Sequence, residues 1–350
     1  MNSFDKKLEV LQNQLAEERR LVSFDSYDMS IRQIYEMFSE GAISIPPEYQ
    51  RQFVWRDERE SELIESVMLG IPVPSLFMAT NQDATWEIVD GVQRLSTVAH
   101  FVGTDLDIAK INRKAPLEIK GLEKLTALNG MTFSDLPKSN QMMFLTRPIR
   151  VTVLNDKSDT NVRFDLFERL NTGGILLTNQ EIRNCIFRGP FNLDLKKFAK
   201  HPDFLTAVKL KESDQKNGMA EEYVLRYFAY LETHAEFEHS VKGFLNSYMK
   251  KHADVRLSKK KLDLFKTTFS FLAKAYPNGI KRGQSSITAA NLYEALSVGL
   301  ALAIQKNYKI LPGILEELAS DGYLKTITTG ATNSKSMVEK RIFFVRDSFK

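Results

Sequence analysis

The chain has 350 residues, of which 43% are hydrophobic and 26% are charged, with a net charge of +4. This is the composition of an ordinary soluble protein, and the length allows two or more domains with cores of their own. The single cysteine, Cys185, excludes an intrachain disulfide and a multi-cysteine zinc site, and we interpret it as a small buried residue on a helix. No apolar run approaches the length of a membrane span, and residues 1–20 are rich in charge, so we expect a cytoplasmic protein with no membrane partner.

The first half of the chain mixes helical and strand-like patterns. Leu8, Leu11 and Leu15 share one face of an N-terminal helix that is otherwise charged. Residues 30–38 are typical of a second helix, and Asp57 is expected to cap a third helix. Short strands are expected at 75–79, 86–89 and 149–154, and loops with one or two short helices at 103–147.

The segment from Trp86 to Thr97 is the most informative part of the chain. A strand-like run stops at Asp90 and Gly91 and restarts as a helix. Glycine permits a tight turn and a close approach of the backbone, while the helix that follows offers unpaired N–H groups and the positive end of its dipole. Arg94 adds a planar cation, so the turn can hold an anion while Asp90 holds a metal ion or a water. Taken alone, D-G-x-x-R also fits a strand-to-helix turn with a surface ion pair.

Three more motifs accompany this turn. The run I-P-P-E-Y-Q-R-Q-F-V-W covers 45–55, a helix ends in G-I-P at 70–72, and F-E-R-L-N-T-G-G-I-L-L-T covers 167–178. With D-G-V-Q-R-L-S-T at 90–97, they resemble in order and spacing the DUF262 family, the N-terminal module of Gmr-type (type IV) restriction enzymes and of the phosphorothioate-sensing Ssp defence nuclease. The resemblance implies a ParB/sulfiredoxin-like fold that binds a nucleoside triphosphate (NTP) without a P-loop. No G-x-x-x-x-G-K-[S/T] string occurs.

The second half of the chain is helical in pattern. Thr178 opens a capping box with Glu181, so a helix should start there and end near Gly189. We therefore expect an α+β fold with a nucleotide-binding mixed α/β domain at 1–190 and an all-helical domain at 191–350. Further helices are predicted at 220–233, 240–251, 258–275, 288–305, 312–319 and 334–348.

Residue types at the D-G-x-x-R turn suggest their roles. We expect Arg94 and Arg51 to bind phosphate oxygens through paired hydrogen bonds. Gln93 and Gln50 can orient a water or read the edge of a base. Asp90 is expected to hold Mg²⁺, because this ion prefers one or two carboxylates plus substrate phosphates. The catalytic set is thus Asp90, Gln93 and Arg94, with Asp90 as the metal ligand. The nucleotide-binding set is Tyr49, Gln50, Arg51, Gly91, Ser96, Thr97, Asn171, Thr172 and Gly173.

Several of these residues also have a plain structural interpretation. Tyr49 fits a core or pocket-wall position as well as a position that stacks on a base. Arg51 could form an ion pair with Glu48 or Glu87. Asn171 could end a helix, a role that asparagine fills well.

Positive charge is concentrated in one window of the second domain. Residues 242–282 hold eleven Lys or Arg and only two acids, Asp254 and Asp263. Such asymmetry favours an anionic partner, and DNA is the expected one, although a solvated helix face would have the same composition. Lysine-rich segments contact phosphates and do not read bases. The DNA-binding residues predicted on this basis are Lys250, Lys251, Arg256, Lys259, Lys260 and Lys261.

Two functional classes follow. In many relatives of the DUF262 type an HNH nuclease domain follows the helical region, but no cluster of that kind occurs after His252, so the chain is not expected to cut DNA by itself. The first class is an NTP-hydrolysing sensor subunit of a restriction or antiphage defence system, with a separate nuclease or toxin as effector. The second is a non-hydrolysing ParB-like DNA-binding adaptor, favoured by Val92, which replaces the usual glutamine of the family. Self-association is compatible with both classes.

Overall fold

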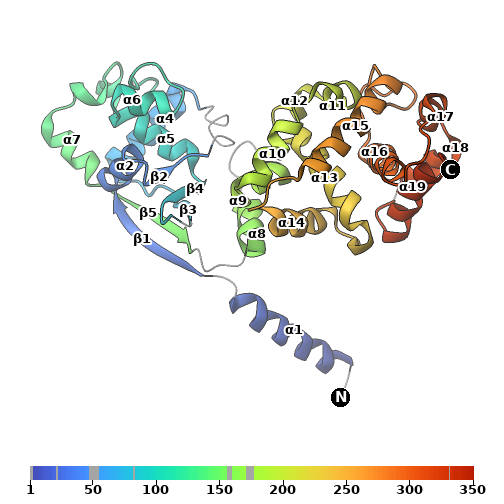
Figure 1. Cartoon of the computed structure of the whole chain (residues 1–350). Coiled ribbons are helices and arrows are strands. Elements are labelled where there is room, and N and C mark those ends of the chain that lie inside the picture. Colours follow the sequence, from blue (N-terminus) through green and yellow to red (C-terminus); the bar gives the residue numbers. More distant parts are fainter. Residues whose placement is uncertain are drawn as a thin grey trace. The chain divides into compact units, whose positions relative to one another are not determined.

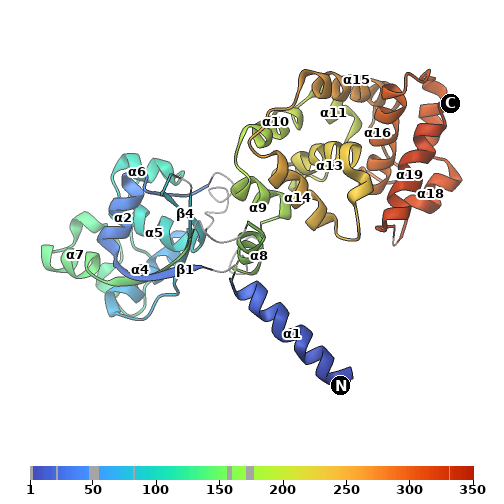
Figure 2. The ribbon, with the colours of Figure 1, turned by 60° about the horizontal axis from the view of Figure 1, so that its bottom comes forward.

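The computed structural model describes residues 3–20, 23–46, 55–81, 83–155, 160–170, 177–330 and 332–350. The chain divides into two compact units, Met1–Leu177 and Thr178–Lys350. The first contains all the strands found in the described residues together with several helices, and the second is helical (Figures 1 and 2). The predicted α+β class is therefore confirmed. The domain boundary at residue 190 remains a prediction. The two compact units are instead divided between Leu177 and Thr178.

A mixed sheet with the strand order β1-β5-β3-β4-β2 forms the centre of the first unit. β1 is antiparallel to β5 and β3 is antiparallel to β4, whereas the β3–β5 and β2–β4 pairs are parallel. Because β2 and β4 are parallel, the chain leaves both strands at the same end of the sheet. The strands are β1 Phe24–Ser30, β2 Ile43–Ser44, β3 Leu76–Thr80, β4 Trp86–Asp90 and β5 Pro148–Leu154.

The helices of this unit start where the local chemistry favours them. Ser30 caps α2, since its hydroxyl accepts a hydrogen bond from the Gln33 N–H while the Gln33 side chain accepts one from the Ser30 N–H. Helix α5 packs against α2 and α4 and contributes Leu95 and Val98 to the core. The helices are α1 Ser3–Arg20, α2 Ile31–Ser39, α4 Asp57–Leu69, α5 Val92–Val102, α6 Asp105–Lys110, α7 Lys138–Leu145 and α8 Thr160–Leu170, with short 3-10 turns at Thr126–Leu128 and Phe133–Asp135.

Two features of this unit differ from the sequence analysis. Asp57 does not cap α4, because the cap position is Arg56, which makes no side-chain capping bond. Asp57 is instead the first helical residue, where its negative charge interacts favourably with the positive end of the helix dipole. Strands β1 and β2 were not predicted, because β1 lies at the edge of the sheet with polar, mostly exposed residues and β2 has only two residues.

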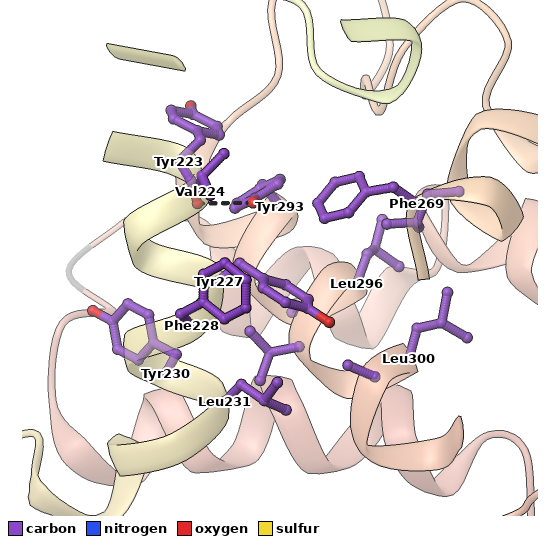
Figure 3. Close-up of a cluster of buried hydrophobic side chains, with 14 of the residues drawn as sticks. Tyr223, Val224, Tyr227, Phe228, Tyr230, Leu231, Phe269, Tyr293, Leu296 and Leu300 are labelled. Carbon is purple, nitrogen blue, oxygen red and sulfur yellow. Dashed lines mark hydrogen bonds between the residues drawn. The ribbon is translucent and has the colours of Figure 1, made fainter. Parts of the chain in front are cut away.

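The second unit is built around an aromatic core. Tyr223, Tyr227 and Phe228 of α13 face Phe269 of α15 and Tyr293 of α16 (Figure 3), and the Tyr293 hydroxyl donates a hydrogen bond of 2.8 Å to the Tyr223 carbonyl. The helices are α9 Asn179–Ile186, α10 Pro190–Phe198, α11 Pro202–Ala207, α12 Glu212–Gln215, α13 Met219–Thr233, α14 Val241–His252, α15 Lys259–Ala275, α16 Ala290–Gln305, α17 Pro312–Leu318, α18 Gly322–Thr328 and α19 Lys335–Asp347, with a 3-10 turn at His234–Glu236.

Several predicted helix starts agree with the structure. Thr178 forms the predicted capping box with Glu181 at the start of α9, and Ser240 and Ser258 cap α14 and α15 with their hydroxyls. Cys185 is buried on α9, as expected. Within the described ranges, no helix has both the length and the apolar character that a membrane span requires.

Candidate functional site

The turn between β4 and α5 requires a glycine. Gly91 has a φ of 98°, in the left-handed region that side chains disfavour. A Cβ atom at this position would lie 2.5 Å from a methyl carbon of Leu76 and 2.9 Å from Nη2 of Arg94. Gly91 has no side chain that could cap α5, and the start of a helix favours negative charge.

Asp90 and Arg94 form an ion pair across this turn. Nη2 of Arg94 lies 2.8 Å from Oδ2 of Asp90 and also donates a hydrogen bond of 3.0 Å to the carbonyl of Ser75. The two side chains are 27% and 16% exposed for Asp90 and Arg94, so the pair is reachable from solvent but not fully hydrated. The ion pair expected from the plain interpretation of D-G-x-x-R is therefore present, and Arg94 holds the end of β4 against the start of α5.

Gln93 connects the turn to the end of the 45–55 motif. The Trp55 N–H donates a hydrogen bond of 3.2 Å to Oε1 of Gln93. At the other end of this motif, β2 pairs with β4, with Ser44 opposite Glu87. The described residues on both sides of 47–54 thus lie beside β4 and α5. Tyr49, Gln50 and Arg51 themselves lie outside the described residues.

The 167–178 motif also starts next to β4. Helix α8 packs against β4, and its Phe164 and Phe167 are buried. Three of the four motifs therefore meet at one strand and the turn that follows it. Asn171, Thr172 and Gly173 come after the end of α8 and lie outside the described residues.

Ser96 and Thr97 lie deeper than expected for residues that contact a ligand. Their side chains are 1% and 0% exposed, and neither hydroxyl has a hydrogen-bond partner among the described residues. Hydroxyls in a helix usually bond to the carbonyl four residues earlier, so two such unpaired groups in consecutive positions are uncommon. They leave hydrogen-bonding capacity behind the turn.

The residues at this turn fit a phosphate-bearing ligand with a loosely held cation. Gly91 lets the backbone approach a ligand closely, and the uncapped helix end and Arg94 favour negative charge. Among the described residues, no group of three or more His, Cys, Asp or Glu gathers as a metal cage. Asp90 offers a single carboxylate, which suits Mg²⁺, an ion that keeps waters and substrate phosphates among its ligands.

A comparison with protein families shows what this segment is similar to. Residues 31–188 match the GmrSD restriction endonuclease, N-terminal domain. This match confirms the resemblance inferred from the four motifs, all of which lie inside it, and it indicates a component of a restriction or defence system. No curated protein and no solved structure matches the chain. The ParB/sulfiredoxin-like character of the fold therefore stays a prediction.

Within the GmrSD-type domain, sequence reasoning missed a buried polar cluster. Glu60 of α4, His100 of α5 and Arg113 of the following loop are joined by hydrogen bonds below Trp55. The acid Glu87, which lies between Trp86 and Ile88 of β4, is also fully buried. The signal that could have found the cluster was an acid within a helix or strand pattern that is apolar on the side facing the core, but Arg113 comes from residues 103–147, whose patterns are weak.

The predicted DNA-binding residues lie outside the GmrSD-type match, around the α14–α15 connection. Arg256 forms an ion pair of 2.6 Å with Asp194, and Lys261 forms one of 2.7 Å with Glu232. These two cations are therefore partly neutralised by acids of the same unit. The exposed members are Lys250, Lys251, Arg256, Lys259 and Lys260.

The position of three of these lysines opposes the local electrostatics. Lys259, Lys260 and Lys261 occupy the first turn of α15, which has no acidic residue. Positive charge is unfavourable at this end of a helix dipole. An anionic partner would relieve that cost.

Proposed function

We propose that the GmrSD-type domain binds a nucleoside triphosphate with Mg²⁺ and hydrolyses it, and that the chain is the sensor or regulatory subunit of a restriction or antiphage defence system. The observation that supports this most directly is the turn at Gly91, where an uncapped helix end, an aspartate and an arginine meet. These are the group types that bind phosphate and its cation. A separate nuclease or toxin is the proposed effector.

Each residue of the turn has a task in this proposal. The first N–H groups of α5 and the Arg94 guanidinium bind phosphate oxygens, and Arg94 offsets the charge that develops as the terminal phosphoryl group departs. Asp90 holds the cation or orients the attacking water. Mg²⁺, when bound, neutralises phosphate charge. Gln93, fixed by Trp55, contributes a directed amide.

Two further surfaces of the chain suit its partners. The exposed lysines at the start of α15 suit a DNA backbone. On α1, Leu8, Leu11 and Leu15 are 42%, 48% and 51% exposed along one face. Such a stripe suits an apolar helix of the effector. The effector would respond to the nucleotide if it binds one nucleotide state of this chain more tightly than the other.

Phosphate release from each of the four NTPs, with and without DNA, tests the enzymatic part. Arg94→Ala should weaken nucleotide binding by about 1.5–3 kcal/mol, the value of a charge-assisted hydrogen bond. Asp90→Ala should reduce turnover more than binding. Arg150→Ala is the matched control, because Arg150 also pairs with an aspartate at 2.8 Å in the same unit but on the exposed β1–β5 edge. Unchanged affinity of Arg94→Ala in titration calorimetry would refute the assignment.

The alternative is a non-hydrolysing, ParB-like DNA-binding adaptor. Val92 favours it, because this residue is 6% exposed and packs in the core, so the turn lacks one amide that the family usually has. Stable nucleotide binding without phosphate release would select this alternative.

The role as a subunit has its own test. Purification from the native host, with and without nucleotide, should yield a second protein whose retention depends on nucleotide. The chain alone should not degrade DNA. Magnesium-dependent cleavage by the pure chain that no substitution in the motifs abolishes would overturn the sensor model.

A further inference from the structure

The main chain of Trp55 is held on both sides by side chains from other segments. Its N–H donates to Oε1 of Gln93 at 3.2 Å, and its carbonyl accepts a hydrogen bond of 2.7 Å from Nη2 of Arg113. The indole ring lies 5.5 Å from the guanidinium of Arg59. Helix α5 and the loop after α6 therefore hold one residue between them, at the point where α4 is about to begin.

Arg113 is itself held in place by the buried side chain of Glu60. Its Nη2 also donates to Oε1 of Glu60 at 2.6 Å, and the second oxygen of this fully buried carboxylate lies 2.7 Å from Nδ1 of His100. Nε2 of His100 lies 2.9 Å from the carbonyl of Ala115, which can only accept, so Nε2 carries a hydrogen. A buried carboxylate is tolerated when donors and cations satisfy it, and here they come from two different elements.

We propose that Arg113 is a positioning residue for the nucleotide site. Held by Glu60 and His100, it fixes the carbonyl of Trp55, and the N–H of Trp55 in turn fixes the amide of Gln93. This inference rests on the proposed function, because Gln93 is one of the residues expected to act in NTP hydrolysis.

The hydrogen bond from Trp55 determines the direction of the Gln93 amide. An amide side chain can present either its oxygen or its nitrogen to a ligand, and the two ends are interchangeable by rotation. Because the Trp55 N–H can only donate, it selects Oε1 as the end that faces it. Nε2 is thereby directed elsewhere. Loss of Arg113 should let Trp55 and the Gln93 amide reorient without removing any group that binds phosphate.

The consequence is a particular kinetic signature. Arg113→Gln should lower kcat about tenfold, the effect of one misplaced hydrogen-bonding group, and change KM less than about twofold. Arg113→Lys keeps a cation for Glu60 and should restore part of the loss. The matched control is Arg147→Gln, since Arg147 of the same unit also donates to a main-chain carbonyl, that of Met68 at 3.2 Å. It should leave both constants unchanged.

Tryptophan fluorescence provides a readout that does not depend on activity. The chain has two tryptophans, so Trp86→Phe leaves Trp55 as the reporter. In that background, Arg113→Gln should increase quenching of Trp55 by acrylamide at least about twofold, whereas Arg147→Gln should not alter it. Urea unfolding of each variant establishes that the domain remains folded, and Arg113→Lys supplies a second test if Arg113→Gln unfolds.

The outcomes separate the two proposals. No NTP hydrolysis by the unaltered protein would refute the proposed function, and the role of Arg113 in it as well. Normal hydrolysis together with unchanged kcat and unchanged quenching in Arg113→Gln would overturn the positioning role alone. A rise in KM at constant kcat would also overturn it, because that result places Arg113 in contact with the nucleotide.

Discussion

The charged residues at the centre of the second unit and those at the turn after β4 in the first unit are arranged differently. In the second unit, five charged residues from four helices form one buried chain of alternating sign. Arg183 pairs with Glu222 at 3.0 Å, Arg226 bridges Glu222 and Glu294 at 2.8 and 2.6 Å, and Arg341 completes the chain on Glu294. Burial alone would raise the pKa of Glu222, but Arg226 and Arg183 hold it below its usual value. Each of these charged groups lies beside one of opposite sign, and we call the five residues the buried charge ladder.

At the turn after β4 the pattern is different. Asp90 and Arg94 form one pair that remains partly exposed, and the hydroxyls of Ser96 and Thr97 behind it have no partner among the described residues. A partly exposed ion pair can exchange its partner for a ligand, whereas a buried network cannot do so without leaving a buried charge unpaired. The ladder therefore contributes to stability, whereas the turn is the place where the proposed function expects a ligand.

The largest effect should come from breaking the ladder. Glu294 is fully buried between Arg226 and Arg341, so Glu294→Gln takes the ladder carboxylate from the buried Arg341 and leaves Arg226 with Glu222 alone. We expect the free energy of unfolding to fall by about 3–5 kcal/mol in urea titrations. Asp28→Asn, which removes the exposed partner of Arg150, should change it little. Equal losses in the two variants would contradict the comparison.

Gly91→Ala should affect both stability and nucleotide binding. The added methyl group would meet Leu76 and Arg94 and would require a left-handed backbone, so we expect a loss of about 3 kcal/mol and no measurable nucleotide binding. Gly41→Ala is the control, because Gly41 has a φ of 82° but open space around it. Its loss should be about 1 kcal/mol, the backbone cost alone, with binding intact.

A smaller effect that depends on pH is expected at Asp107, a satisfied acid within the unit that contains the turn. It accepts hydrogen bonds from Tyr35 and Thr104 at 2.8 Å and from Lys110 at 2.9 Å. Burial would raise its pKa, but these donors hold the pKa far below the usual value. Asp107→Asn should cost about 2 kcal/mol at pH 7.

The pH dependence of stability tests this account of Asp107. Because the folded pKa of Asp107 is depressed, its contribution is present above the unfolded pKa of about 3.9 and is lost as the pH falls below that value. The stability difference between Asp107→Asn and the unaltered protein should therefore shrink below about pH 4 in thermal unfolding. A difference that stays constant down to pH 2 would contradict this account.

The smallest effect concerns the lysines of α15. Lys259→Ala with Lys260→Ala should flatten the salt dependence of duplex DNA binding, by about 0.9 log units of affinity per tenfold salt for each phosphate that is no longer neutralised. Lys261→Ala should flatten it less, because Glu232 already pairs with Lys261. Identical salt slopes for all variants in fluorescence anisotropy would assign the cluster to solvent.

Local chemistry made part of this structure predictable. The capping groups of Ser30, Thr178 and Ser258 mark helix starts because their hydroxyls bond N–H groups within the next turn. The turn at Gly91 was predictable for the same reason, since an acid, a glycine and an arginine at short spacing have few arrangements.

Long-range contacts were not predictable in this way. The bond between Trp55 and Gln93 spans 38 positions, and the one between Trp55 and Arg113 spans 58. Neither leaves a periodic trace in the sequence. The edge strand β1 was missed because its exposed residues do not alternate in polarity. Composition also could not show that Arg256 and Lys261 form ion pairs with acids of the same unit. These pairs leave fewer cations for an anionic partner than the sequence suggested.

The position of α9 has a consequence for how such modules can be exchanged. The GmrSD-type match extends to residue 188, yet Thr178 already belongs to the second unit and donates a hydrogen bond of 2.6 Å to the Asn217 carbonyl. Arg183 of α9 is the first member of the buried charge ladder. A chimera joined at 188 would carry α9 away from Glu222 and bury an unmatched cation or expose it. A transferable module should therefore end at Leu177, so homology and folding place the border of this module at different residues.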